Sequence, residues 1–209
     1  MRTGNAAFIT GLSNAKTDGL APRRFLYLKA KTRTDPVEDY NIGFWTGDDD
    51  VTVNVVDGET GLVVSRTYYG MGKSLFIPKI PRTSDLSIQM VQVTMSQLAI
   101  EAQTLVRENN VRFAKADIHE GLLSTETRLL VSAPEIAFLG EVDGDPVDTP
   151  EVGGVGQIGI ELVSDAIRSL TRTNPKKRSY ETQLERSGDL FGSYSNLVEN
   201  IEVVWGEAK

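Results

Sequence analysis

The sequence predicts a mainly β protein with a few short helices, arranged as two β-barrel-like or sandwich-like subdomains that share a core. Three observations lead to this prediction. Short apolar stretches with the two-residue period of strands recur along the chain, turn residues separate them, and only brief stretches have a helical period. With 209 residues, of which 40% are hydrophobic, the chain is long enough for one sizeable domain or two small ones.

The N-terminal region predicts an arm followed by a buried strand. Residues 1–24 contain several glycines and a proline without strong periodicity, so we expect a loose extension there. The next stretch, RFLYLKAK, predicts a strand with Phe25 and Tyr27 on one face and Leu26 and Leu28 on the other. Because both faces are apolar, we expect this strand to lie between two layers.

Several short strands follow. The stretches NIGFWT, VTVNVV and LVVSRTYY read as strands, with turns at residues 47–50, 57–58 and 70–72. Residues 86–95 form the longest strand candidate. Its apolar face changes between Met90 and Val91, which predicts a bulge or a crossing from one sheet to another.

The second half repeats a pattern of strand, serine and helix. Ser96 is expected to cap a helix that ends at residues 109–110, with an apolar stripe of Leu98, Ala102, Leu105 and Val106. Strands are expected at residues 111–118, 129–132, 136–142 and 157–163, with a loop rich in Gly, Pro and Asp at 143–156. Ser164 is then expected to cap a short helical turn. The repeated pattern is compatible with an internal duplication.

The C-terminal stretch, residues 170–206, begins with a basic corner around Pro175. A short helix is expected after Ser179, with Tyr180 and Leu184 on one face and a left-handed stop at Gly188. Asp189 then opens a turn, and a last strand at residues 200–206 ends near Trp205.

Composition limits the classes of function. The formal net charge is −7, and the chain has no cysteine. An acidic chain is poorly suited to bind DNA, since affinity for phosphates comes from Lys and Arg. The negative charge suits a passage that DNA crosses without binding. The alternative is that the charge only keeps the protein soluble. No run of 18 apolar residues predicts a membrane span, and the first residues do not read as a signal peptide.

Motif tests predict no catalytic, cofactor or metal site. The G-x-G-x-x-G match at residues 154–159 follows a loop and precedes a strand pattern, whereas a dinucleotide site needs a strand before the motif and a helix after it. Gly72-Lys73-Ser74 lacks the first glycine of a P-loop, because Thr67 occupies that position. Three consecutive aspartates at 48–50 do not match a calcium loop, and His119 is the single histidine. We therefore expect a protein that is not an enzyme.

Four stretches of the sequence carry a family resemblance. They are FWTGDDDVTV at residues 44–53, IPRTSDLSIQMVQVTMSQL at 80–98, VRFAKADIHEGLL at 111–123, and NPKKRSYETQLERSGDLFGSY followed by a strand ending in Val-Trp-Gly. Together they resemble the tail-tip hub module of long-tailed bacteriophages. More narrowly, they are similar to the hubs of phages and gene transfer agents of Rhodobacter-like bacteria, related to the lambda-type minor tail protein L. The resembling module would cover residues 25–206.

The resemblance implies a structural virion protein at the tail tip of a siphophage-like particle, made in the host cytoplasm. In that family each chain contributes two similar tail-tube-type β domains to a homotrimeric ring, which adapts the sixfold distal tail to the threefold central fibre and forms part of the DNA conduit. The implied partners are the distal tail protein ring, the central fibre or tail-hub protein, and the tape-measure protein. Many related hubs also hold an iron–sulfur cluster in a cysteine-rich part; without cysteine, that cofactor is not carried over.

Two sets of residues are candidates for such a role. Candidate interface residues, which otherwise belong to the core or to a solvated corner, are Trp45, Arg172, Lys176, Lys177, Arg178 and Trp205. Candidate acidic residues facing the channel, which otherwise lie on outer turns, are Asp48, Asp49, Asp50, Asp143, Asp145 and Asp148. The alternatives to a hub are a hexameric distal tail protein and a non-catalytic β module that binds surface glycans.

Overall fold

One continuous sheet contains all the strands that the structure describes. The computed structural model describes residues 5–80, 88–144, 147–148, 156–166, 180–185 and 188–193. The chain divides into two units, Met1–Leu170 and Thr171–Lys209. The strands of the first unit, in chain order, are β1 (Ala21–Thr32), β2 (Asp39–Trp45), β3 (Val51–Val56), β4 (Val63–Gly70), β5 (Leu75–Phe76), β6 (Met90–Ser96), β7 (Asn109–Leu123), β8 (Glu135–Gly144), β9 (Val147–Asp148) and β10 (Gln157–Ser164).

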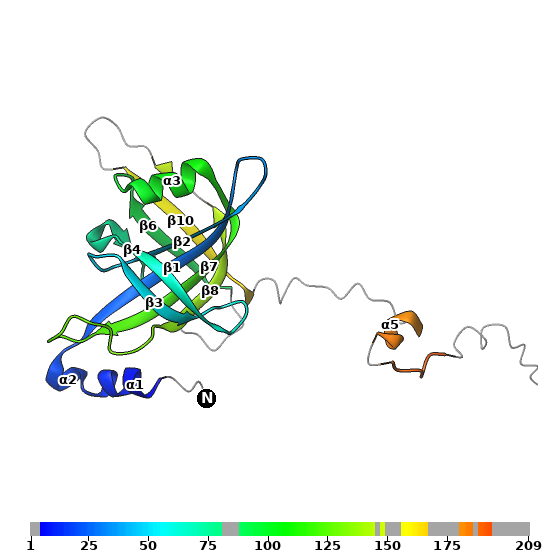
Figure 1. The fold of residues 1–209 in the computed structure, drawn as a ribbon, viewed down its shortest axis with the longest axis horizontal. Helices are drawn as coiled ribbons and strands as arrows, with labels where there is room; N and C mark the ends of the chain where they lie inside the picture. The colour runs from blue at the N-terminus through cyan, green and yellow to red at the C-terminus, as the bar shows by residue number, and fades with distance from the viewer. Residues whose placement is uncertain are drawn as a thin grey trace, which may run out of the picture. The chain divides into compact units, whose positions relative to one another are not determined.

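The mainly β prediction is confirmed, but the described strands do not divide into two barrels or sandwiches. They form one ten-stranded sheet in the order β3-β4-β2-β1-β7-β8-β10-β6-β5, with β9 paired to β10. The two end strands of this order do not pair with each other, so the described sheet stays open. Helix α3 (Ile100–Glu108) lies at one end of the curled sheet, and α1 (Ala6–Ser13) and α2 (Ala15–Asp18) lie at the other (Figure 1).

Strand β1 is buried on both faces, as the sequence predicted. Leu26 and Leu28 belong to the main core, together with residues from β2, β6, β7, β8, β10 and α3. Phe25 belongs to a second, smaller core cluster with Trp45, Val55 and Tyr68, against which Tyr27 packs. One strand therefore supplies apolar side chains to two layers.

The second layer is the hairpin formed by β3 and β4. These strands pair along their whole length, from Val51 opposite Tyr68 to Val56 opposite Val63. Strand β4 is joined to β2 by only a short parallel ladder, in which Phe44 and Trp45 lie opposite Tyr69 and Gly70. The hairpin covers aromatic rings of β1 and β2, where Phe25 stacks on Trp45 with ring centroids 5.3 Å apart.

Helix α3 begins later than predicted. Ser96 ends β6 and does not cap the helix; Ala99 is the N-cap residue and makes no side-chain cap bond. Leu98 is 85% exposed and lies outside the stripe, while Ala102, Leu105 and Val106 are buried as expected. The helix thus closes one end of the main core with three side chains.

The predicted bulge between Met90 and Val91 is wrong. Strand β6 pairs with β10 without a register shift from Met90 to Ser96. The apparent change of face arises because Met90 is 59% exposed, whereas Val91 is buried. A register shift lies instead between β1 and β7, near Lys29, where Phe113 has a φ of 63°.

The N-terminal residues form two short helices where the sequence predicted a loose arm. Asn5 caps α1 by accepting a bond from the backbone nitrogen of Ala7 at 2.9 Å. The backbone nitrogen of Asn5 contacts the carboxylate of Glu135 on β8, and the Thr125 hydroxyl donates to the carbonyl of Asp18 at 2.8 Å. These distant partners, rather than a strong local pattern, hold the helices.

The described part of the second unit is small. Helix α5 spans Tyr180–Leu184, and Gly188 adopts a φ of 75° while its backbone nitrogen donates to the carbonyl of Leu184 at 3.0 Å. The backbone nitrogen of Phe191 then donates to Asp189 at 3.0 Å, which forms the predicted turn. The helix and its left-handed stop are therefore confirmed; the predicted strand at 200–206 lies outside the described residues.

Candidate functional site

The turn between β2 and β3 presents three exposed carboxylates, those of Asp48, Asp49 and Asp50. The indole nitrogen of Trp45 donates to the backbone carbonyl of Asp49 at 2.7 Å. The backbone nitrogen of Gly70, at the end of β4, donates to the carboxylate of Asp50 at 2.9 Å. Both contacts fix this acidic turn (residues 48–50) to strands of the core.

Close packing adds to the constraint on the acidic turn. A Cβ atom on Gly70 would lie 2.3 Å from the backbone oxygen of Asp48, which is closer than real Cβ contacts come. The backbone nitrogen of Gly72 also donates to the carbonyl of Gly47 at 2.8 Å. The end of β4 therefore fits against the turn only with glycine at position 70.

Trp45 lies in the core, which is the role the sequence favoured over an interface anchor. Its side chain is 7% exposed and stacks on Phe25. Its contribution to the surface is indirect, because its indole group holds the backbone of Asp49. The structure thus brings together Trp45 and Asp48, Asp49 and Asp50, which the sequence placed in different candidate sets.

The other candidates are separate or lie outside the described part. Asp143 is exposed near the end of β8. Asp148 belongs to β9, of which the backbone alone is described. The remaining candidates, all outside the described residues, are Asp145, Arg172, Lys176, Lys177, Arg178 and Trp205.

A buried network of charged side chains lies beneath the hairpin, and the sequence analysis missed it. The Arg66 guanidinium on β4 pairs with Asp57 at the hairpin turn and with Asp117 on β7, the latter at 2.8 Å. Lys29 on β1 pairs with the same Asp57 at 2.7 Å and with Glu59 at 3.2 Å. The network therefore ties the hairpin to two central strands of the sheet.

Further hydrogen bonds complete this charged network. Asp57 accepts bonds from the backbone nitrogen and the hydroxyl of Thr60, at 3.0 and 2.8 Å. Asp117 accepts one from the backbone nitrogen of Gly58 at 3.3 Å. The Arg66 guanidinium also lies 3.9 Å from the centroid of the Tyr27 ring, a cation–π contact. Buried charges persist when they are paired and bonded in this way.

The network shifts the pKa of its members. Burial opposes the charged form of Asp57, but bonds from Lys29 and Thr60 outweigh burial and hold its pKa below the ordinary range. Burial likewise opposes the charge on Arg66, but the bond and charge of Asp117 raise its pKa. Burial is opposed in the same way at Lys29, where bonds to Asp57 and Glu59 raise the pKa. All three groups are thus charged at neutral pH.

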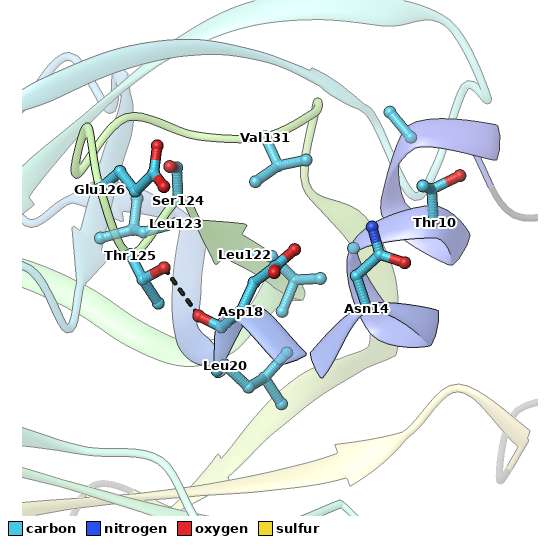
Figure 2. Close-up of a pocket in the computed structure, with 13 residues that line it drawn as sticks. Thr10, Asn14, Asp18, Leu20, Leu122, Leu123, Ser124, Thr125, Glu126 and Val131 are labelled. Atoms are coloured by element: carbon cyan, nitrogen blue, oxygen red, sulfur yellow. Dashed lines mark hydrogen bonds between the residues drawn. The ribbon is translucent and has the colours of Figure 1, made fainter. Parts of the chain in front are cut away.

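A cavity of about 470 Å³ lies between the N-terminal helices and the end of β7 (Figure 2). Thr10 and Asn14 come from the helices, and Ser124, Thr125 and Glu126 come from the loop after β7. Leu20, Leu122 and Val131 add apolar surface. This cavity offers a ligand hydroxyl, amide and carboxylate groups beside apolar side chains.

Neither a metal-binding cluster nor a known relative points to a further site in the part of the chain that the structure describes. Within the ranges that the structure describes, no group of three or more His, Cys, Asp or Glu side chains is placed to hold a metal ion. No described helix is both long and apolar enough to cross a membrane. Neither a protein family nor a curated protein matches the chain.

Proposed function

We propose that this protein is a structural subunit of a phage-like tail tip, a baseplate hub that forms a trimeric ring. In this role it joins the sixfold distal tail ring to the threefold central fibre and lines part of the path that DNA takes during ejection. The resemblance of four sequence stretches to tail-tip hubs supports the assignment. Among structural observations, the one that carries it is the acidic turn, residues 48–50.

The acidic turn suits a surface that DNA passes without binding. Its three exposed carboxylates repel phosphates, and the bonds from Trp45 and Gly70 keep them in one position. A ring of three copies presents the turn three times. Lysines in the same place would attract the DNA backbone by releasing counterions, and that attraction grows with each contact.

The test exchanges the charge of the turn. The turn variant carries Asp48→Lys, Asp49→Lys and Asp50→Lys. The control variant changes Asp35, Glu38 and Asp39 to Lys; these are exposed residues at the opposite end of β2. Both variants alter the net charge equally. DNA release from triggered particles is followed with an intercalating dye at about 50 and 200 mM salt.

We expect only the turn variant to retain DNA, and to do so more strongly at low salt. Nine added lysines per ring fall in the range of 6–10 phosphate contacts, for which affinity falls by about 10³- to 10⁵-fold between these salt concentrations. If the turn variant releases DNA as the control does, the acidic turn does not face the channel.

The copy number tests the ring itself. A reconstruction of the assembled tail tip is expected to contain three copies of the chain in one ring. Six equivalent copies would refute the hub proposal and favour a distal tail protein.

A glycan-binding module would need exposed aromatic side chains gathered on one loop. The described exposed aromatics lie instead on separate parts of the chain; they are Tyr69, Phe76, Phe113 and Phe191.

A further inference from the structure

His119 lies on β7, beneath the hairpin of β3 and β4. It is the single histidine of the chain and is 0% exposed. On β7 it stands opposite Phe25 of β1, whose ring belongs to the smaller core cluster. Its Nε2 atom lies 2.8 Å from the carbonyl oxygen of Val56, the last residue of β3. One histidine thus bonds the sheet to the end of a hairpin strand.

This bond defines the protonation state. A carbonyl oxygen only accepts, so Nε2 carries the hydrogen and donates it to Val56. Nδ1 of the neutral ring is then unprotonated, and it is buried without a hydrogen-bond partner among the described residues. Protonation places a second N–H at Nδ1, which has no acceptor in the described part of the chain, and adds a positive charge at a fully buried position. Both changes oppose the closed position of the hairpin.

We propose that the hairpin of β3 and β4 is an acid-released cover over the aromatic rings of β1 and β2, and that protonation of His119 on β7 releases it. The release is local. The hairpin shares only two paired backbone positions with the rest of the sheet, those between β2 and β4. Its side-chain links to β1 and β7 are the charged network and the bond from His119, so it can lift by breaking them while the long ladder between β1 and β7 stays intact.

The charged groups that act on His119 come from three elements. They are Asp117, two residues away on β7, Arg66 on β4 and Asp57 at the hairpin turn. Lys29 of β1 and Glu59 of the turn join the same network through their ion pairs, while Tyr27 of β1 and Tyr68 of β4 belong to the adjoining aromatic cluster. Strand β8 places apolar Ile136 opposite His119. The carboxylates of Asp57, Glu59 and Asp117 outnumber the cations of Lys29 and Arg66 by one. Asp117 and Asp57 therefore favour a histidine cation and Arg66 opposes it, but the effect of burial is larger and favours the neutral ring.

The direction of the pH effect follows from burial. Burial lowers the pKa of His119 below its ordinary value of 6.5. Once the hairpin lifts, the imidazole is exposed and binds a proton near that ordinary value. The open state therefore binds more protons, and the closed state is fully favoured above about pH 6.5 and loses stability as the pH falls below it.

Hydrogen exchange of the full-length chain between about pH 7.5 and 5 tests this inference. After correction for the intrinsic exchange rate, the opening constant of β3 and β4 amides should rise about tenfold per pH unit below 6.5. The opening constants of β6 and β10 amides should not rise over the same pH range. The variant His119→Gln keeps a donor for Val56 and does not titrate, so its hairpin profile should be flat.

Three results would overturn the acid-released cover. The first is an opening constant of the wild-type hairpin that does not change with pH. The second is an equal rise in the opening constant of β10 amides. The third is a hairpin opening constant that depends on pH in His119→Gln as it does in the wild type. If that variant does not fold, the imidazole resonance of the wild type decides, since a single histidine gives one assignable set of signals. Protonation of the imidazole should occur over the same pH range as the opening of the hairpin. If the imidazole is protonated while the hairpin stays closed, the proposal is refuted. These measurements use the isolated chain and do not depend on its place in a tail.

Discussion

Replacing Arg66 by methionine tests the role of the buried charged network. Methionine has a similar length and packs well in irregular spaces, so the change removes the charge and leaves most of the volume. Arg66 is 5% exposed and pairs with Asp57 and Asp117, which are 4% and 5% exposed. In the variant, Asp57 keeps Lys29, while Asp117 keeps only the backbone nitrogen of Gly58.

The expected cost is large because a buried carboxylate loses its cation. Breaking one side of a buried ion pair destabilises a protein by about 3–5 kcal/mol. The lost cation–π contact with Tyr27, worth about 0.5–2 kcal/mol, is part of the same change. We therefore expect Arg66→Met to lower the free energy of unfolding by about 3–5 kcal/mol at neutral pH.

Urea unfolding followed by tryptophan fluorescence measures this cost. The chain has two tryptophans, so a Trp205→Phe background leaves Trp45, which stacks on Phe25 under the hairpin, as the only reporter. Arg107→Met is the matched control, because Arg107 is exposed on α3; we expect a loss of less than about 1 kcal/mol.

A second substitution separates the lost charge from lost packing. In Arg66→Met with Asp117→Asn, the unpaired charge is gone and the amide oxygen still accepts from Gly58. We expect the double variant to recover about 1–3 kcal/mol relative to Arg66→Met. An Arg66→Met protein as stable as the control, or a double variant no more stable than the single one, would refute this account of the network.

Three further stability predictions use matched positions. Leu105→Ala should cost about 2–5 kcal/mol in urea unfolding because the side chain is fully buried, whereas Leu98→Ala, at 85% exposure, should change little. Gly70→Ala should lower the melting temperature, because its Cβ overpacks the acidic turn at a cost of about 1–3 kcal/mol. Gly11→Ala should raise helix stability by about 0.5–1 kcal/mol, because the nearest atom to its Cβ lies 3.4 Å away. Equal changes in the melting temperatures of the two variants would contradict this prediction. Because the pKa of Asp57 is lowered, its contribution is complete above about pH 5 and declines progressively as the pH falls below the ordinary value of 3.8 toward the lowered pKa. Asp57→Asn should abolish this part of the acid dependence in unfolding measured from pH 6 to 3.

Strands with clear alternation could be predicted from the sequence. The two apolar faces of RFLYLKAK correctly placed β1 between two layers, since a strand needs cover on every apolar face. The stretch VTVNVV matches β3 from Val51 to Val56, because turn residues bound it on both sides. Local pattern and tertiary position agree in these strands.

Other elements depend on contacts that the local sequence does not contain. The N-terminal helices are held by Glu135 and Thr125, more than a hundred residues away along the chain. Met90 reads as a core residue because it is apolar, yet it is exposed, and that error created the false bulge. Hydrophobicity alone does not say which apolar side chains a neighbouring element covers.

The acidic turn was predicted as a turn, but its anchoring to Trp45 was not, because a hydrogen bond to a backbone carbonyl has no sequence signal. The charged network joins Arg66 to Asp57 and Asp117, 9 and 51 residues away. A signal did exist: Arg66 and Asp117 each interrupt an apolar strand at an inward position. A charge in such a position indicates a buried partner elsewhere.

The order of strands in the sheet also governs how the chain folds as it is made. Strands β1 to β4 are neighbours within the first 70 residues, but β1 needs β7, which ends at Leu123, to complete its other edge. At about 5–20 residues per second, this partner follows several seconds later. Until then Leu26, Leu28 and Phe44 lie uncovered on the nascent sheet. We therefore expect the rate of synthesis, or a chaperone that binds this face, to affect how much of the first half aggregates before β7 is made.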